Sequence, residues 1–446
     1  MVRRAWCGVQ DRYGRLGDGI DAKEPEPFSY DRDYVVLLSD WTDENPTRVL
    51  AKLKKQSDYY NQHKRTVGDF IDDVSEMGWS AAVADRKMWA EMKMSPTDLA
   101  DVSGYTYTYL MNGQAPDGNW TGIFKPGEKI RLRFINASAM TYFDVRIPGL
   151  KMTVVAADGL HVKPVSVDEF RIAVAETYDV IIEPDSEQAY TVFAQSMDRT
   201  GYARGTLAVQ EGLSAPVPSP DPRPLIAMGD MGMDHGSMGG MDHGNMAGMD
   251  HGSMAGMDHG SMQGGMAGMA GAMQAHPASE TNNPLVDMQT MTPTHKLDDP
   301  GIGLRDNGRR VLTYSDLRST FLDPDGREPS RTIELHLTGH MEKFSWSFDG
   351  IKFSDAEPLR LKYGERVRIT LVNDTMMTHP IHLHGMWSDL EDANGNFLVR
   401  KHTIDMPPGS KRSYRVTADA LGRWAYHCHL LLHLEMGMFR EVRVDE

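Results

Sequence analysis

Gly127-Glu-Lys-Ile-Arg-Leu-Arg-Phe-Ile-Asn136 is the stretch that decides the fold, because its pattern returns at Gly364-Glu-Arg-Val-Arg-Ile-Thr-Leu-Val-Asn373. In both copies apolar residues alternate with charged or polar ones, which is the period-two pattern of a half-buried strand. The match continues without a gap through Met140-Thr-Tyr142 and Met377-Thr-His379. The chain is therefore predicted to contain two homologous β-domains.

Short strand-like runs broken by glycine and proline flank each copy, and this pattern favours β-sandwiches and an all-β fold. We place the two sandwiches at residues 28–212 and 301–446. Residues 45–100 differ, because Asn45-Pro46 is a helix-start signal, and they are predicted to be a helical insertion in the first sandwich. Residues 1–27 fit neither pattern and are interpreted as a remnant or aberrant N-terminal segment.

Methionine is concentrated between the two sandwiches, in a segment rich in Gly, Met, Asp, His and Ser. Residues 213–300 are therefore predicted to be a disordered, Met/His-rich flexible linker. Four histidines recur there inside Met-Asp-His-Gly units, namely His235, His243, His251 and His259. Soft thioethers select cuprous ion and imidazoles extend the affinity to cupric ion, so we interpret the repeats as copper ligands. The alternative is a plain flexible spacer.

Overall composition narrows the function classes. The 446 residues carry a formal net charge of -16, so a nucleic-acid partner has no electrostatic support and cations are favoured. No run of about 18 apolar residues is present to span a membrane. The only cysteines, Cys7 and Cys428, stand near opposite ends of the chain, which excludes a disulfide framework.

Two histidine-rich stretches in the second β-domain carry the chemistry, His379-Pro-Ile-His-Leu-His-Gly385 and His427-Cys-His-Leu-Leu-Leu-His433. On a strand, residues two apart share a face, so His382 pairs with His384 and His427 pairs with His429. Cys428 faces the other way, where three further side chains can join it: His379, His433 and Met438. A thiolate, two imidazoles and a weak thioether are the ligands of a blue-copper site. Zinc accepts similar donors, but the thioether and the paired histidines favour copper.

The repeat provides an internal control for this prediction. The positions equivalent to His379, His382 and His384 are occupied in the first copy by Tyr142, Val145 and Ile147. The His427-Cys-His429 segment corresponds roughly to Ala194-Gln-Ser196. The first β-domain is therefore predicted to keep the fold without a copper site of this kind.

These motifs resemble the multicopper oxidases, most closely the bacterial copper-resistance protein A family. The similarity also covers Ser103-Gly-Tyr-Thr-Tyr-Thr-Tyr-Leu-Met-Asn112 and the Met-rich repeats. The resemblance implies cupredoxin-like Greek-key sandwiches. It also implies a type 1 copper held by His379, Cys428, His433 and Met438, a type 2 copper held by His382, and a type 3 pair held by His384, His427 and His429.

The activity implied by the resemblance is oxidation of cuprous ion, or of phenols, with dioxygen as acceptor. Cys428, His427 and His429 would be the catalytic link between the copper sites, and the location would be periplasmic. The family has an earlier cupredoxin domain with two more His-x-His motifs, and neither motif occurs here. We therefore expect an N-terminally truncated member with half of the cluster histidines, unless another chain donates the rest. The alternative function is copper sequestration without turnover.

Overall fold

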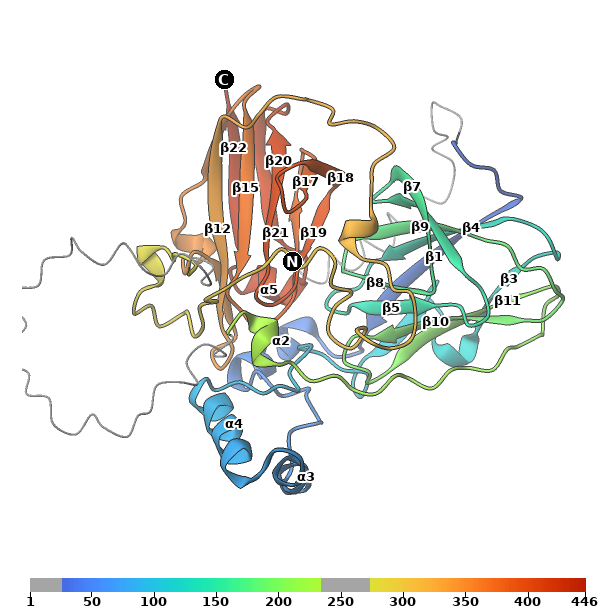
Figure 1. Cartoon of the computed structure of the whole chain (residues 1–446), viewed down its shortest axis with the longest axis horizontal. Coiled ribbons are helices and arrows are strands. Elements are labelled where there is room, and N and C mark those ends of the chain that lie inside the picture. The colour runs from blue at the N-terminus through green and yellow to red at the C-terminus, as the bar shows by residue number, and fades with distance from the viewer. Residues whose placement is uncertain (1–25, 234–272) are drawn as a thin grey trace, which may run out of the picture.

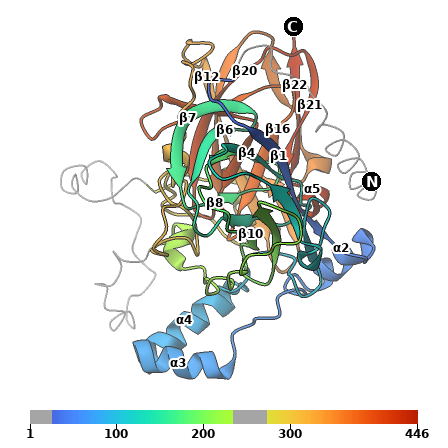
Figure 2. The same ribbon diagram turned by 90° about the vertical axis from the view of Figure 1, so that its right-hand side faces the viewer.

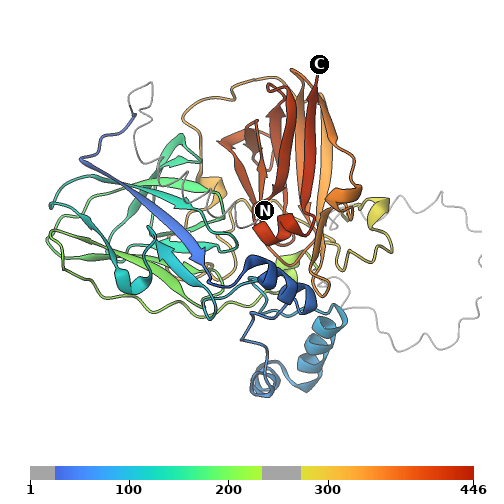
Figure 3. The same ribbon diagram turned by 180° about the vertical axis from the view of Figure 1, so that it is seen from behind.

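The computed structural model describes residues 26–233 and 273–446, and these residues form a mostly-β, cupredoxin-like structure, as predicted. Two β-sandwiches lie side by side, and each pairs a six-stranded with a five-stranded sheet (Figures 1 and 3). Within the described ranges, no helix combines the length and the apolar character that a bilayer crossing requires.

The strands of the first sandwich run in two sheets with the orders β2-β1-β4-β9-β6-β7 and β3-β11-β10-β5-β8. Their bounds are β1 (Arg32–Trp41), β2 (Thr108–Met111), β3 (Trp120–Ile123), β4 (Ile130–Asn136), β5 (Phe143–Arg146), β6 (Met152–Ala157), β7 (Leu160–Val167), β8 (Glu169–Ile172), β9 (Thr177–Ile182), β10 (Tyr190–Ser196) and β11 (Tyr202–Ala208).

The second sandwich repeats this arrangement, with the orders β13-β12-β15-β20-β17-β18 and β14-β22-β21-β16-β19. Its strands are β12 (Arg331–His340), β13 (Ser345–Phe348), β14 (Leu359–Lys362), β15 (Arg366–Asn373), β16 (His379–Leu383), β17 (Ser388–Glu391), β18 (Phe397–Lys401), β19 (Thr403–Met406), β20 (Lys411–Thr417), β21 (Gly422–Cys428) and β22 (Phe439–Asp445).

The repeated stretch of sequence occupies equivalent places in the two sandwiches. β4 and β15 are both third in their six-stranded sheets, and each is parallel to the first long strand of its domain. Their last residues, Asn136 and Asn373, are buried, and each side-chain amide donates to one backbone carbonyl in the loop that follows and to another at the end of a neighbouring strand, β8 or β19. The same asparagine therefore fixes the same turn in both copies.

Three helices separate β1 from β2, namely α2 (Pro46–Lys55), α3 (Val67–Met77) and α4 (Trp79–Glu91), and α3 and α4 project below the sandwiches (Figures 1 and 2). α2 begins where the sequence signals it, because Asn45 Oδ1 accepts from the Thr47 amide at 2.9 Å and Pro46 occupies the first turn. Val49 and Leu53 share one helical face and are buried.

Described residues at both ends of the predicted linker pack against the sandwiches. Met231 and Met288 are buried in the core, and the backbone amide of Thr290 donates to Asp374 Oδ1 at 2.8 Å. Short 3₁₀ turns form at Met228–Met231 and Ala278–Glu280. These flanking methionines pack as core residues, which the composition of the segment does not predict. The repeats themselves lie outside the described residues.

Buried polar contacts join the two sandwiches. The Lys401 ammonium lies 3.0 Å from Asp158 Oδ2 and 3.1 Å from Glu176 Oε1, and all three side chains are buried. The Tyr142 hydroxyl donates to Asp405 Oδ1 at 2.8 Å. These contacts hold the first sandwich against the edge of the second that carries β16 and β19.

Candidate metal centre

The histidine motifs lie on two neighbouring strands, β16 and β21, which pair antiparallel with Ile381 opposite Cys428 and His382 opposite His427. Because side chains alternate along a strand, His382 and His427 point to one side of the sheet. Cys428 points to the other side. Two separate groups of ligands therefore arise from one pair of strands.

The first group surrounds the Cys428 thiol. Its Sγ lies 3.6 Å from His379 Nδ1 and 3.8 Å from His433 Nδ1, and these two nitrogens are 3.1 Å apart. All three residues are fully buried. The short helix α5 (Leu431–Glu435) follows β21 and brings His433 back to the thiol. Met438 is also buried, and its carbonyl accepts from the Cys428 amide at 3.1 Å.

Outer contacts orient both imidazoles of this group. His433 Nε2 lies 2.8 Å from Asp101 Oδ2, and His379 Nε2 lies 2.7 Å from Thr375 Oγ1. The Trp346 ring stacks on His433, with ring centroids 4.0 Å apart. When Nε2 carries the hydrogen, the Nδ1 lone pair of each ring is directed at the site. Sequence reasoning missed all three residues, and Asp101 belongs to the other sandwich.

Burial determines how the side chains of this group are protonated before a metal binds. It raises the pKa of the Cys428 thiol well above its usual value, with the charges of Asp101 and Asp405 acting in the same direction. Burial also lowers the pKa of His379 well below 6.5, and the neighbouring His433 adds to this effect. The site without metal therefore holds a neutral thiol and a neutral His379. A metal ion must displace the thiol proton on binding.

The second group consists of the four histidines on the opposite side of the strand pair. His384 Nε2 lies 3.1 Å from His427 Nε2, and the ring centroids of His382 and His384 are 4.7 Å apart. The His427 and His429 centroids are 5.4 Å apart. The His429 Nδ1 atom is buried without a hydrogen-bond partner, as expected of a nitrogen reserved for a metal.

A cavity of about 510 Å³ separates this group from the first sandwich. His382, His384 and His429 line it on one side, and Trp41 and Ile135 are among the residues on the other. His402 also lines the cavity, and its carbonyl lies 2.6 Å from His382 Nδ1. Sequence reasoning missed His402, because it stands outside any His-x-His motif. This hydrogen bond leaves Nε2 of His382 available as a ligand.

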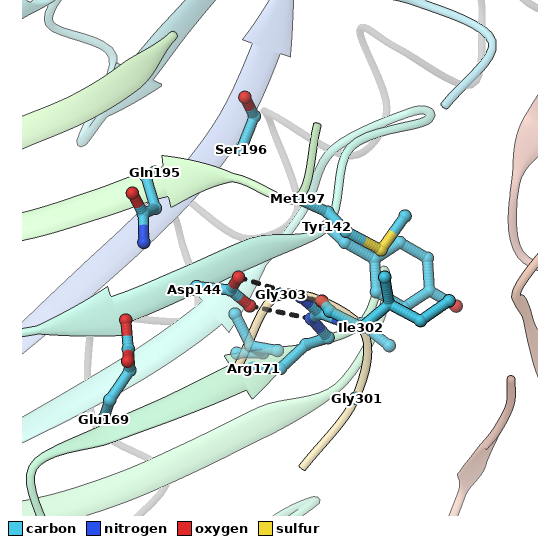
Figure 4. Close-up of polar contacts among 12 residues, drawn as sticks. Tyr142, Asp144, Glu169, Arg171, Gln195, Ser196, Met197, Gly301, Ile302 and Gly303 are labelled. Atoms are coloured by element: carbon cyan, nitrogen blue, oxygen red, sulfur yellow. Dashed lines mark hydrogen bonds and ion pairs between the residues drawn. The ribbon is translucent and has the colours of Figure 1, made fainter. Parts of the chain in front are cut away.

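The first sandwich carries other side chains at the positions of the predicted copper ligands. In its equivalent strand pair, β5 and β10, Asp144 lies opposite Gln195 and Val145 opposite Ala194, so Gln195 takes the place of Cys428. Asp144 is buried and receives hydrogen bonds from Arg171 Nε at 2.7 Å and Arg171 Nη2 at 2.9 Å (Figure 4). A buried ion pair between Asp144 and Arg171 thus lies on this strand pair. The register confirms the predicted equivalence of Ala194-Gln-Ser196 with His427-Cys-His429.

Comparison with known proteins decides the family. Models of the multicopper oxidase family match residues 32–212 and 326–446. A copper resistance protein A homolog of Pseudomonas syringae pv. tomato is 75% identical over 98% of this chain and 75% of its own length. The chain belongs to the multicopper oxidase family. Copper resistance protein A of Escherichia coli, 74% identical over 98% of this chain and 76% of its own length, places this multicopper oxidase in the same group.

The fold comparison agrees with this assignment. Fet3p, a multicopper oxidase that functions in iron import, superposes with a TM-score of 0.55 at 14% sequence identity, covering 95% of this chain and 68% of its own. At this identity the likeness concerns the fold alone. It agrees with the cupredoxin-like architecture of both sandwiches.

Copper is the cofactor of this multicopper oxidase, and the residues present fit it. A thiol that ionises on binding and two imidazoles that turn Nδ1 toward it meet in a buried group at Cys428. This donor set matches a type 1 copper site. Of the other predicted ligands, His235, His243, His251 and His259 lie outside the described residues, as does Cys7.

The contact between Asp101 and His433 gives a first testable expectation. Asp101→Asn removes the carboxylate that orients the imidazole, so copper affinity at the Cys428 group should fall by about 10–100-fold while the blue colour at saturation persists. Titration of the apoprotein with copper against a competing chelator measures the change. Asp198→Asn is the matched control, because that buried carboxylate bonds only near neighbours in the first sandwich. Equal affinities of Asp101→Asn and the wild type would contradict the assigned role.

Proposed function

We propose that this multicopper oxidase oxidises cuprous ion, or a phenolic reductant, with dioxygen as the electron acceptor. The observation that carries the proposal is the position of Cys428 between His427 and His429 on one strand. Its thiol joins His379 and His433 on one side of the sheet, while both flanking imidazoles face the other ligand group. Copper bound at these sites supplies one-electron redox chemistry.

The roles of the side chains follow from their positions. Cys428, His379, His433 and Met438 would hold the type 1 copper, and the covalent chain connects the Cys428 thiolate directly to His427 and His429. The His427 Nδ1 atom also lies 2.8 Å from the Cys428 carbonyl oxygen, which adds a second short link between the two groups. His382 would hold the type 2 copper, and His384, His427 and His429 would hold the type 3 pair.

A role in copper resistance, in the periplasm, is proposed from the relatives. The proteins from Pseudomonas and Escherichia coli are copper resistance proteins by name. Oxidation of cuprous ion would account for such a role. It removes the form of copper that thioether and thiolate groups bind most strongly. The Met-rich repeats around His243 and His251 would collect copper for the enzyme.

Copper sequestration without turnover is the second candidate, and one observation favours it. Among the described residues that line the cavity of about 510 Å³, the histidines all come from the second sandwich, namely His382, His384, His402 and His429. The first sandwich contributes such residues as Trp41, Ile135 and Ser138 to the opposite side. These side chains supply no imidazole to complete an oxygen-reducing cluster.

Oxygen uptake by the copper-loaded full chain tests the proposal. With cuprous ion or a phenol as reductant, we expect oxygen consumption, and His384→Gln should lower its rate by at least about tenfold, because the variant loses a cluster ligand 3.1 Å from His427 Nε2. The same variant should keep the blue absorption, since His384 faces away from Cys428. Blue colour and a full copper load without oxygen uptake in the wild type would overturn the oxidase and support sequestration.

A further inference from the structure

A second cluster of metal-binding side chains lies in the second sandwich, outside the copper ligands described above. It consists of His276, Glu280, His336 and Asp374, whose ligand atoms all lie within 4.8 Å of one another. His336 comes from β12, and Asp374 directly follows β15. His276 and Glu280 come from the ordered segment that follows the Met-rich repeats in the sequence. Three separate stretches of chain thus meet at one point.

Short distances between unlike groups define the centre of this cluster. Asp374 Oδ2 lies 2.6 Å from His336 Nδ1 and 3.3 Å from His276 Nδ1. Glu280 Oε2 lies 3.3 Å from His276 Nδ1, and Glu280 Oε1 lies 3.7 Å from His336 Nδ1. Both imidazoles thus present the same nitrogen, Nδ1, to the same two carboxylates.

Outer hydrogen bonds hold all four side chains in this orientation. His276 Nε2 lies 3.0 Å from the Thr290 carbonyl, and His336 Nε2 lies 3.4 Å from Glu334 Oε1, so each ring has an acceptor on its far side. Gln289 Nε2 donates to Glu280 Oε2 at 2.8 Å, and the Thr290 amide donates to Asp374 Oδ1. Acceptors behind the imidazoles and donors behind the carboxylates are the arrangement that orients ligands in metal sites.

The cluster is incompletely satisfied by its own members. Glu280 is only 3% exposed, and its Oε1 atom has no hydrogen-bond partner. The buried Nδ1 atom of His276 also makes no contact that has the geometry of a hydrogen bond. If the cluster served only as a set of ion pairs, both atoms should have partners, because a buried polar atom without a partner costs free energy. A cation at the centre would satisfy both.

We propose that His276, Glu280, His336 and Asp374 form an additional metal site that binds a divalent transition ion, cupric ion in this copper-handling chain. Two imidazoles and two carboxylates suit cupric or zinc ion and contain no soft sulfur donor for cuprous ion. The two carboxylates neutralise the charge of the ion, so protons bound to the empty cluster would leave on binding. The site would also fasten the segment around His276 and Glu280 to the sandwich.

The cluster is adjacent in the chain to the type 1 ligands. Asp374 is followed by Thr375, whose hydroxyl lies 2.7 Å from His379 Nε2. Asp374 itself accepts from His336 and from the Thr290 amide. The cluster and the Cys428 group are nevertheless distinct, because they share no ligand.

Copper stoichiometry of the full chain tests this site. The probe is cupric ion, added to the apoprotein and followed by dialysis and elemental analysis. The double variant H276Q/E280Q should retain one copper ion per chain fewer than the wild type, with unchanged blue absorption from the Cys428 group. The matched control is H340Q, because His340 lies on the same strand as His336 and approaches a single carboxylate, Asp287, at 3.7 Å.

Equal copper content in the double variant, the control and the wild type would overturn the proposal. Glu280→Gln alone provides a second measurement, because it preserves the shape and the contact with Gln289 while removing one charge. The affinity of Glu280→Gln for cupric ion at the proposed site should fall by at least about tenfold. An unchanged affinity would count equally against the site. Neither result depends on oxygen uptake, so this proposal and the proposed oxidase can fail separately.

Discussion

Cys428→Ser is expected to abolish the blue absorption of the copper-loaded protein and to lower its copper content by one ion per chain. Among the described residues, Cys428 supplies the one thiolate near His379 and His433, and a serine hydroxyl in the same buried place does not ionise at neutral pH. The two imidazoles alone would bind copper weakly. Visible absorption and elemental analysis of the loaded protein measure both effects.

The loss should also appear in stability. A ligand that binds only the folded state stabilises it by about 2.7 kcal/mol at a free concentration 100 times its dissociation constant. Copper should therefore protect the wild type against thermal unfolding more than it protects Cys428→Ser. Cys7→Ser is the control for loss of a cysteine in general and should behave as the wild type does. An unchanged spectrum in Cys428→Ser would show that the type 1 assignment is wrong.

Copper binding at this group should weaken as the pH falls. Burial raises the pKa of the Cys428 thiol in the empty site, so a proton must leave when copper binds, and acid favours the protonated form. The same burial lowers the pKa of His379, so that ring stays neutral and does not oppose binding near pH 7. The thiol proton therefore governs the pH dependence near neutrality.

Much of the fold and of the group around Cys428 could be predicted from the sequence, because both depend on local periodicity. The alternation at residues 127–136 and 364–373 identified β4 and β15, and the spacing of His427, Cys428 and His429 assigned their faces. A period of two is visible in a single stretch of chain.

The residues that were missed depend on contacts between distant parts of the chain. Asp101 reaches His433 from the other sandwich, and His402 reaches His382 from the end of a neighbouring strand. No spacing rule joins such residues. The same reason explains the cluster around His336, whose four members come from three separate stretches with no common motif. The packing of Met288 and Thr290 is missed for a similar reason, because the composition of residues 273–300 does not reveal the surface on which they pack.

Lys401→Met is expected to lower the free energy of unfolding by about 3–5 kcal/mol, because it leaves two buried carboxylates without their cation. Burial alone would lower the pKa of Lys401, but Asp158 and Glu176 raise it above its ordinary value, so the ammonium is charged in the folded protein. Methionine fills similar space and carries no charge. Urea unfolding at neutral pH measures the difference.

The pH dependence of this loss separates a charge effect from a packing effect. In the variant, burial and mutual repulsion should raise the pKa values of Asp158 and Glu176, so protonation on acidification relieves the repulsion. The difference from the wild type should therefore shrink as the pH falls from 7 toward about 4. In the wild type, His402 and Lys401 outweigh the burial of Asp158 and lower its pKa below its ordinary value. The stabilisation from Asp158 is therefore lost only at a pH below this window.

The matched control is Lys129→Met, which removes a lysine from an exposed ion pair with Glu183 and should change the free energy of unfolding by no more than about 1 kcal/mol. A loss in Lys401→Met that stayed constant with pH would show that packing, and not the buried charges, joins the sandwiches there. The contact matters for function because Lys401 precedes His402, whose carbonyl holds His382 at the cavity. Loosening it should therefore disturb the cluster histidines before it reaches Cys428, which lies on the opposite side of the sheet.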